Sequence, residues 1–372
     1  MRPPRFEMER MQSTWEHRVR YDLSESGVEP LTLGELLALV GRDLGDLRLG
    51  YADGRGREAT RAQVARIHPG ASADDVLVTT GTSEANFLTV TTLVERGDEV
   101  VVVLPNYMQV HGLARGLGAT VREVWLEEDG GWGLDHDRLA AAVNARTKLV
   151  CVCTPNNPTG QLLSAADLDA VARLAEGVGA WVLSDEVYRG TEHDGVESAS
   201  MWGRYERVVV TGGLSKAYGL PGLRIGWIVA PPERIEAAWA QKDYTTIATA
   251  TLSEALAEAA LPKREALLAR TRGLVAERWP ALERWAVGHG RKLRWTRPRA
   301  GAIAFFGYSY DVDSGPFVDR LIHERGTMVV PGSQFLAERH LRIGYGGSVA
   351  KLRAGLAEVD AALARLGEKA AV

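Results

Sequence analysis

Six short apolar runs, separated by longer amphipathic stretches, constrain the fold of this chain more than any other feature. The runs are VLVTT (76–80), EVVVVL (99–104), KLVCVC (148–153), WVLSD (181–185), RVVVTG (207–212) and IGWIVA (225–230). They are continuous rather than alternating, as expected for strands buried on both faces. Helical patterns such as 83–95 and 164–177 lie between them, and this alternation predicts a largely parallel sheet with helices on both faces. We place this α/β domain at residues 46–250.

The flanking segments have a different pattern. Residues 253–290 are long and helical in character, and residues 301–345 contain short strand-like runs. A final helix is expected to begin near Ser348, a good N-cap residue. We therefore expect residues 1–45 to join residues 255–372 in a smaller α+β domain.

Composition excludes several classes of function. The 372 residues include 44 Lys and Arg against 48 Asp and Glu, a formal charge of −4, so no basic surface for nucleic acid is expected. No window approaches 18 uninterrupted apolar residues, so we expect no membrane span. The first twenty residues are charged and lack an apolar core, which favours a cytoplasmic protein. Cys151 and Cys153 lie two apart on one expected strand, so we expect neither a disulfide nor a metal site.

Lys216 is the most informative of only seven lysines. It lies in TGGLSKAYGLPGLRIGW, just after a buried strand and among several glycines. A lysine there can be a solvated surface residue, or it can reach a ligand at the carboxyl edge of the sheet. Burial and a neighbouring cation such as Arg224 would lower its pKa enough for a Schiff base to form.

Two further motifs follow other expected strands. Asn157 lies in TPNNPTG (154–160), which is either a simple βα turn or a turn that offers an amide to a ligand. Asp185 ends the run WVLSD, where a buried carboxylate needs a cationic partner. A protonated pyridine nitrogen is such a partner, and an Asp of this kind together with a lysine Schiff base is typical of pyridoxal phosphate sites. Tyr188 could donate to the phenolic oxygen of the same ring.

The segment TTGTSEANF (79–87) predicts an anion cradle. A strand ends near Gly81, and Thr82 and Ser83 begin a helix. Backbone N–H groups and two hydroxyls at a helix N-terminus suit one phosphate, although such residues are more often only an N-cap.

In their order and spacing, these motifs resemble the fold type I pyridoxal-phosphate-dependent enzymes, the class I/II aminotransferase superfamily, from about residue 20 to residue 365. The resemblance implies the type I transferase fold, with a mainly parallel seven-stranded sheet in the large domain, and pyridoxal 5′-phosphate as the cofactor. It also implies an amino-acid substrate and a homodimer with shared active sites.

The resemblance gives roles to residues that the motifs alone do not single out. Tyr107 matches the aromatic residue that stacks on the cofactor ring, so that Lys216, Asp185 and Tyr107 form the expected catalytic set. Tyr51 matches a tyrosine that reaches the phosphate in the neighbouring subunit, and Arg224 matches a second cationic phosphate ligand.

Arg342, in LRIGYG, matches the arginine that binds the substrate α-carboxylate, with Asn157 beside it. One position departs from the family pattern: Gly213 stands where Ser or Thr normally binds the phosphate.

The reaction type stays open at this stage. Within the superfamily the chain is similar to capreomycidine synthase-like and aminocyclopropane-carboxylate synthase-like enzymes of specialised metabolism, which favours elimination, replacement or cyclisation at Cβ and Cγ. For such enzymes S-adenosylmethionine or an arginine derivative is an example of a substrate. NNPTG and DEVY instead favour an aminotransferase, which we take as the first interpretation. A cofactor-binding regulatory module is disfavoured because no DNA-binding segment is attached.

Candidates for the substrate side-chain pocket are few. They are Glu25, Glu29, Trp15 and Tyr244. Each of them could equally be a packing residue.

Overall fold

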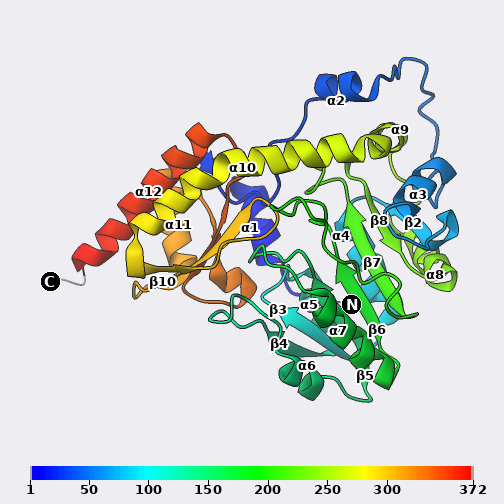
Figure 1. The fold of residues 1–372 in the computed structure, drawn as a ribbon, viewed down its shortest axis with the longest axis horizontal. Coiled ribbons are helices and arrows are strands. Elements are labelled where there is room, and N and C mark those ends of the chain that lie inside the picture. The colour runs from blue at the N-terminus through cyan, green and yellow to red at the C-terminus, as the bar shows by residue number, and fades with distance from the viewer. Residues whose placement is uncertain (1, 370–372) are drawn as a thin grey trace.

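The computed structural model describes residues 2–369 and is built around a seven-stranded sheet (Figure 1). Its strand order is β2-β8-β7-β6-β5-β3-β4, and six of the strands run in the same direction. Strand β8 is antiparallel to both of its neighbours. The strands are β2 (Val76–Thr79), β3 (Glu99–Leu104), β4 (Thr120–Trp125), β5 (Thr147–Cys153), β6 (Trp181–Asp185), β7 (Val208–Gly213) and β8 (Gly226–Val229). The prediction of a mainly parallel α/β sheet is confirmed.

The continuous apolar runs arise because both faces of this sheet are covered. On β5, Val150 and Val152 belong to one buried cluster, whereas Leu149 and Cys151 belong to the cluster on the other face. The same alternation holds along β3. The helices that supply the opposing apolar side chains are α3 (Glu58–Ala65), α4 (Thr82–Leu93), α5 (Gln109–Leu117), α6 (His136–Ala142), α7 (Ala165–Val178), α8 (Pro232–Lys242) and α9 (Thr251–Ala260).

The edge strand β4 was not among the predicted strands. Its sequence TVREVW carries charged residues at Arg122 and Glu123, and most of its side chains are partly exposed. An edge strand is buried less than an interior one, so it lacks the continuous apolar run by which its neighbours were recognised.

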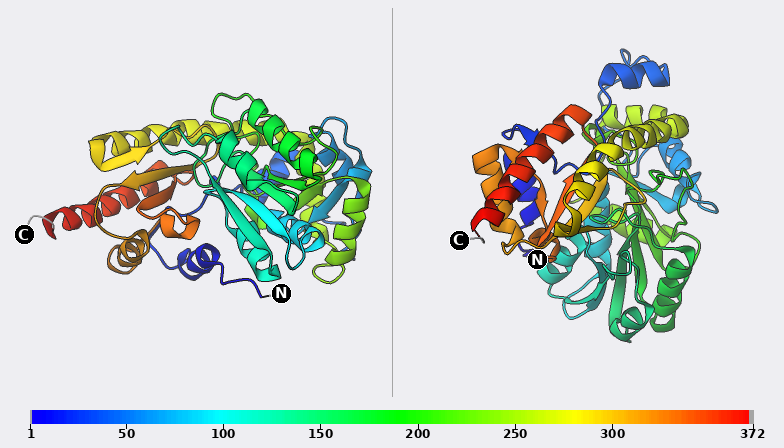
Figure 2. Two further views of the ribbon diagram at one scale, coloured as in Figure 1. Left: turned by 90° about the horizontal axis from the view of Figure 1, so that it is seen from below. Right: turned by 60° about the vertical axis from the view of Figure 1, so that its left-hand side comes forward.

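Residues from both ends of the chain form two smaller sheets with their own helices. A four-stranded sheet contains β9 (Leu293–Trp295), β10 (Ile303–Tyr308), β13 (His340–Gly344) and β12 (Val330–Pro331), and β1 (Tyr21–Asp22) pairs with β11 (Thr327–Met328). Its helices are α11 (Ser314–Arg325), α12 (Val349–Lys369) and the long α10 (Arg264–Gly288), which runs from α9 along this sheet (Figures 1 and 2). The final helix begins after Ser348, as predicted.

We propose that residues 46–250 form a large domain and that residues 1–45 with 255–372 form a small one. A separate buried cluster around Phe306, Leu341 and Leu352 supports the second unit. Two residues of the N-terminal segment, Met8 and Leu36, nevertheless pack into the core of the large sheet.

Two helices in the first 45 residues lie in contrasting places. Helix α1 (Glu7–Trp15) lies at one edge of the molecule in the left view of Figure 2, whereas α2 (Leu33–Val40) projects from the body near α9 (Figures 1 and 2). None of the described helices is long and apolar enough to cross a membrane.

Candidate active site

A cavity of about 260 Å³ lies at the carboxyl ends of β5, β6 and β7, where ligands of open α/β sheets bind. Helix α1, the N-terminus of α4 and strand β13 close its other sides. Nine of the residues expected from sequence line it: Thr82, Ser83, Tyr107, Asn157, Asp185, Tyr188, Lys216, Arg224 and Arg342. The structure therefore brings together side chains from distant parts of the sequence.

Lys216 enters the cavity from the loop after β7 and meets a carboxylate. Its Nζ donates to Glu25 Oε1 at 2.7 Å, and the lysine side chain is 25% exposed. Burial alone would lower the pKa of Lys216, but Glu25 and Tyr188 outweigh burial and place this pKa above its usual value. The expectation that Arg224 would lower the pKa of Lys216 is therefore wrong, because Glu25 is the charge that faces the amine.

Glu25 is held in place for this contact. Its Oε1 also accepts the backbone N–H of Gly27 at 2.7 Å. The Lys216 ammonium, the largest influence, holds the pKa of Glu25 at about 2 against the opposing effect of burial. Glu25 was only one of four candidates for the side-chain pocket, and the structure places it beside the lysine.

Asp185 lies at the end of β6 with its carboxylate buried in the same cavity. Asn86 Nδ2 donates to Oδ2 at 2.9 Å, and the Val187 backbone N–H donates to Oδ1 at 3.1 Å. Asn86 is fixed in turn by the hydroxyl of Thr211 at 2.8 Å. Burial raises the pKa of Asp185 above its usual value, and the two hydrogen bonds oppose that shift. No cation among the described residues pairs with this carboxylate, so it is poised for a cationic ligand group.

Arg342 faces the cavity from β13 and is 1% exposed. It donates from one terminal nitrogen to Asn157 Oδ1 at 2.8 Å and from the other to the Ser24 carbonyl at 2.6 Å. Its Nε has no hydrogen-bond partner among the described residues, and burial lowers the pKa of the guanidinium. A buried, incompletely satisfied guanidinium is suited to a carboxylate ligand.

Two tyrosines, Tyr107 and Tyr188, also line the small cavity. Tyr107 packs against Phe6 with ring centroids 5.0 Å apart, and its hydroxyl donates to Glu9 Oε1 at 2.7 Å. Tyr188 is buried, and its hydroxyl contacts Ser26. Burial raises the pKa of both phenols, so both remain neutral hydrogen-bond donors.

The N-terminus of α4 is the place where we expect an anion to bind. Gly81 has φ of +81°, and a Cβ at this position would collide with the guanidinium of Arg224. Arg224 itself adopts a left-handed backbone conformation, with φ of +51°. Glycine at 81 thus allows the arginine to approach the first turn of the helix, where backbone N–H groups bind anions.

The departure at Gly213 has a steric reason. A Cβ there would lie 2.5 Å from Thr82 Oγ1 and 3.0 Å from the Ile225 carbonyl oxygen. The Thr82 hydroxyl, which donates to the Gly212 carbonyl at 2.9 Å, occupies the space that a larger side chain would need. The hydroxyl group next to residue 213 thus belongs to Thr82 and not to residue 213 itself.

One side of the cavity was missed by sequence reasoning. Glu9, Gln12, Ser13 and Glu16 of α1 and its C-cap all line the cavity. Their spacing of three, four and seven residues places them on one helix face, and this spacing is the signal that could have found them. A polar helix face is normally read as solvent-facing, which explains the omission.

The remaining predicted residues lie outside the cavity. Tyr51 is 94% exposed and Tyr244 is also exposed. Glu29 pairs with Arg278 at 2.9 Å, and Trp15 packs edge-on against His323. Glu29 thus forms an ion pair and Trp15 has a packing role, and neither lines the small cavity.

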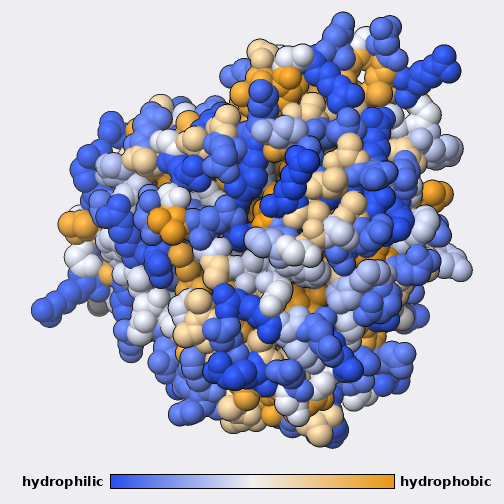
Figure 3. Space-filling model, turned by 45° about the vertical axis from the view of Figure 1, so that its right-hand side comes forward, coloured by the Kyte–Doolittle hydropathy of each residue, from blue (hydrophilic) through white to orange (hydrophobic). Residues whose placement is uncertain are grey.

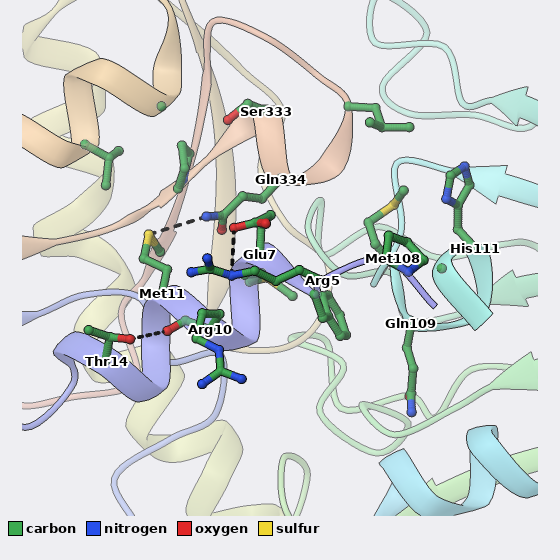
Figure 4. Close-up of a pocket in the computed structure, with 18 of the residues that line it drawn as sticks. Arg5, Glu7, Arg10, Met11, Thr14, Met108, Gln109, His111, Ser333 and Gln334 are labelled. Atoms are coloured by element: carbon green, nitrogen blue, oxygen red, sulfur yellow. Dashed lines mark hydrogen bonds and ion pairs between the residues drawn. The ribbon is translucent and has the colours of Figure 1, made fainter. Parts of the chain in front are cut away.

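A second, larger cavity of about 860 Å³ lies on the other side of α1 (Figure 4). It is lined by the N-terminal segment, α5 and α11, and it contains the exposed pair Arg5 and Glu7, whose charged groups are 3.4 Å apart. Of the predicted site residues it contains only Trp15. Helix α1 therefore separates the two cavities.

The smaller cavity fits pyridoxal phosphate on the observations above. The unpaired carboxylate of Asp185 suits a protonated ring nitrogen, the α4 cradle with Arg224 suits the phosphate, and Lys216 is within the same space. Arg342 is left for a carboxylate of the substrate. No described side chain fills these positions in a way that would exclude the cofactor.

Comparisons with known proteins agree with this arrangement. The model of the family "Aminotransferase class I and II" matches residues 37–359. Capreomycidine synthase of Streptomyces vinaceus is 35% identical over 350 residues, covering 92% of this chain and 90% of that protein.

Two solved structures extend the comparison to three dimensions. A PLP-dependent aminotransferase from Streptococcus suis superposes with a TM-score of 0.92 at 30% identity, covering 98% and 99% of the two chains. The PLP-dependent cyclase OrfR superposes with a TM-score of 0.89 at 30% identity, covering 99% and 98%. The chain therefore belongs to the aminotransferase class I and II family and is an aminotransferase-like enzyme dependent on pyridoxal 5′-phosphate.

Proposed function

We propose that the enzyme transfers the amino group of an L-amino acid, with the cofactor attached to Lys216. The observation that carries this proposal is the convergence of Lys216, Asp185 and Arg342 on one cavity. The bound cofactor supplies an electron sink for negative charge that develops at the substrate Cα. The residues of the chain then have to bind, orient and move protons.

Lys216 and Asp185 perform different parts of this task. Lys216 Nζ would be the group that takes the proton from the substrate Cα and holds it for the next step. Asp185, oriented by Asn86 and Val187, keeps a proton on the ring nitrogen by its negative charge. Tyr107 would cover the ring of the cofactor, and Tyr188 would donate a hydrogen bond to its phenolic oxygen.

Arg342 and Asn157 hold the α-carboxylate of the substrate. From this role we predict that variants of Arg342 bind amino acids weakly. Arg342→Ala should bind the substrate weakly, and Arg342→Lys should bind it no better, because a point charge cannot reproduce a two-pronged contact. Loss of a buried charge-assisted pair costs about 2–5 kcal/mol when its partner is left uncompensated. Absorbance titration of the cofactor-loaded variant with amino acids should therefore show binding weakened by a factor of 30 or more. If Arg342→Ala titrates like the parent protein, another residue holds the substrate.

The cofactor phosphate is bound, in this proposal, by residues of one subunit and by one residue of a second subunit. In this proposal the phosphate binds at the N-terminus of α4, among Gly81, Thr82, Ser83 and Arg224. Tyr51 is too exposed to serve its own cavity, and we propose that it completes the cradle of a partner copy.

We therefore predict a homodimer. Large apolar side chains are exposed in the segment from α2 to α3 and around α8 and α9: Leu33, Leu49, Tyr51, Tyr244, Ile247 and Leu252. Figure 3 shows apolar side chains gathered on the projecting lobe formed by α2. Exposed apolar groups of this kind mark interaction surfaces. Sedimentation should give twice the chain mass of 40.4 kDa at assay concentration. A fully active monomer would contradict this prediction.

Elimination, replacement or cyclisation is the second candidate function. Its support is the similarity to capreomycidine synthase and to a PLP-dependent cyclase, together with an extra carboxylate, Glu25, beside Lys216. The similarity to capreomycidine synthase also supports a role in specialised metabolism. We place this role in the cytoplasm.

Turnover without a keto acid separates the two reactions. An aminotransferase should release one equivalent of keto acid per active site and then stop, because no acceptor restores the cofactor. Addition of a keto acid should restart it. Many turnovers without any acceptor would overturn transamination in favour of the second candidate.

A further inference from the structure

Lys242 is a buried cation that the proposed function does not use. It ends α8, its side chain is 0% exposed, and its Nζ donates to the carbonyls of Gly54 and Ile247, at 2.9 Å each. Both of these partners are neutral, whereas a buried ammonium is normally paired with a carboxylate. Burial lowers the pKa of Lys242, and the more distant carboxylates of Glu84 and Glu254 oppose that shift. The reason for such a costly group lies in the segments that it joins.

The two segments that Lys242 joins are far apart in the sequence. Gly54 lies in the turn between α2 and α3, and Ile247 lies in the loop between α8 and α9 (Figure 1). An ammonium is compact and donates in three directions, so it can bind two carbonyls that converge on one point. Lys242 therefore fixes the turn before α3 against the loop after α8.

The glycines of this turn allow the close approach that the contact requires. A Cβ at Gly54 would lie 2.9 Å from Trp239 Nε1 and 3.4 Å from the carbonyl oxygen of Ile247. At the other end of the turn, Gly56 has φ of +93°, and a Cβ there would collide with Val78 of β2. The turn thus lies directly against α8 on one side and against β2 on the other, and a side chain at either glycine would push it away.

Tyr51 lies between two points at which its backbone is held. Its side chain is 94% exposed, but the carbonyl of Gly50, directly before it, accepts a hydrogen bond from the hydroxyl of Thr251, the first residue of α9. Gly54, three residues after Tyr51, is held by Lys242. The backbone is thus fixed on both sides of Tyr51, while the ring is left free to contact another molecule. A residue that is held in place before it binds loses less conformational freedom on binding.

The loop that Lys242 holds also contacts the N-terminus of α4 in its own subunit. The hydroxyls of Thr245 and Thr246 each donate to Glu84 Oε1 at 2.8 Å. Glu84 lies in the first turn of α4, where we propose that the phosphate binds. The same loop is therefore tied to the turn that carries Tyr51 and to the phosphate-binding end of α4.

From these contacts we infer that Lys242 is a positioning residue for the cofactor phosphate: it holds the turn that presents Tyr51 to the phosphate bound by a partner copy. The inference rests on the proposed function, because it uses the assignment of Tyr51 to the phosphate of a partner. Lys242 does not line the small cavity, so it acts only through the turn. Its effect should therefore appear in the binding of the phosphate group and not in the binding of the ring.

The test compares the cofactor with and without its phosphate. Protein loaded with pyridoxal 5′-phosphate or with pyridoxal is diluted, and the fraction that stays bound is measured by absorbance. Lys242→Met removes the charge and fills similar space, and it should bind pyridoxal 5′-phosphate about tenfold more weakly than the parent, the loss expected for one hydrogen bond to a charged group. Its affinity for pyridoxal should equal that of the parent. A merely structural role would weaken the binding of both forms alike.

Further variants connect the effect to Tyr51. Tyr51→Phe should show the same loss for the phosphorylated form alone, and adding Lys242→Met to it should cause little further loss, because both act through one contact. If Lys242→Met does not fold, Thr251→Val removes the other point of attachment and should also weaken only the phosphorylated form. The matched control is Arg278→Met in α10. Arg278 is also buried and also donates to a backbone carbonyl, that of Gly346, and its loss should keep the parent ratio of the two affinities.

The outcomes separate this inference from the proposed function. If Tyr51→Phe weakens the binding of pyridoxal 5′-phosphate but Lys242→Met and Thr251→Val do not, the inference is overturned and the proposed function stands. If Tyr51→Phe itself has no effect, the proposed role of Tyr51 fails. Equal weakening of both cofactor forms in Lys242→Met would leave Lys242 a structural residue. Sedimentation of Lys242→Met should give the mass of the parent, and separation into single chains would likewise contradict the inference.

Discussion

Replacement of Lys216 by alanine is expected to lower the turnover rate by about 10⁴-fold or more, the upper range for a positioned acid–base group. Lys216 is the one lysine that lines the small cavity in the described part of the chain. Its removal takes away both the covalent attachment of the cofactor and the group that moves the proton at the substrate Cα. Steady-state turnover of the folded variant, with excess cofactor present, measures the effect.

Two control variants sharpen the result. Lys216→Arg keeps the positive charge opposite Glu25 but cannot form a Schiff base, so it should be as inactive as Lys216→Ala. Lys351→Ala removes an exposed lysine from α12 and should retain the activity of the parent protein. Activity of Lys216→Arg close to that of the parent would show that only the charge matters, against the proposed role.

The second large effect is expected for Asp185→Asn, which should lose roughly 10³-fold in rate while still binding the cofactor. The amide keeps the size of the carboxylate but not the negative charge that holds a proton on the ring nitrogen. The hydrogen bond from Asn86 can be kept, since the amide oxygen also accepts. Both the turnover rate and the amount of bound cofactor are measured. The proposal requires that the rate falls and that the bound cofactor does not.

Glu186→Gln is the matched control for this variant. Glu186 is the next residue and is also buried, but it accepts hydrogen bonds from Ser184, Ser200 and Met201 outside the small cavity. Its loss should lower the thermal stability and leave the rate per folded molecule near that of the parent. Near-normal turnover by Asp185→Asn would contradict the role of Asp185.

The sequence was most informative where chemistry coincides with the end of a buried strand. Asp185 ends a continuous apolar run and Lys216 follows another, and parallel strands bring such ends to one edge of the sheet. The sequence alone therefore predicts that both residues lie at one site. Arg342 and Tyr107 required the family resemblance, since neither has a local pattern that distinguishes it from a packing residue.

Contacts between distant segments could not be predicted in this way. Glu25 and Lys216 are 191 positions apart, and nothing local to either residue indicates that they pair. This contact reversed the expected direction of the lysine pKa shift. The polar face of α1 was missed for a related reason, because a polar stripe normally faces water and only the packing of α1 over the cavity buries its surroundings. The steric cause of Gly213 depends on Thr82, which is also remote in sequence.

The most direct test of the account is to find the residue that carries the cofactor. The purified protein should be yellow, and borohydride should fix the pyridoxal group permanently to the chain. Digestion and mass spectrometry should then locate the modification on the peptide that contains Lys216 and on no other. Modification of any of the other six lysines in its place, or a protein that retains no pyridoxal group, would contradict the account.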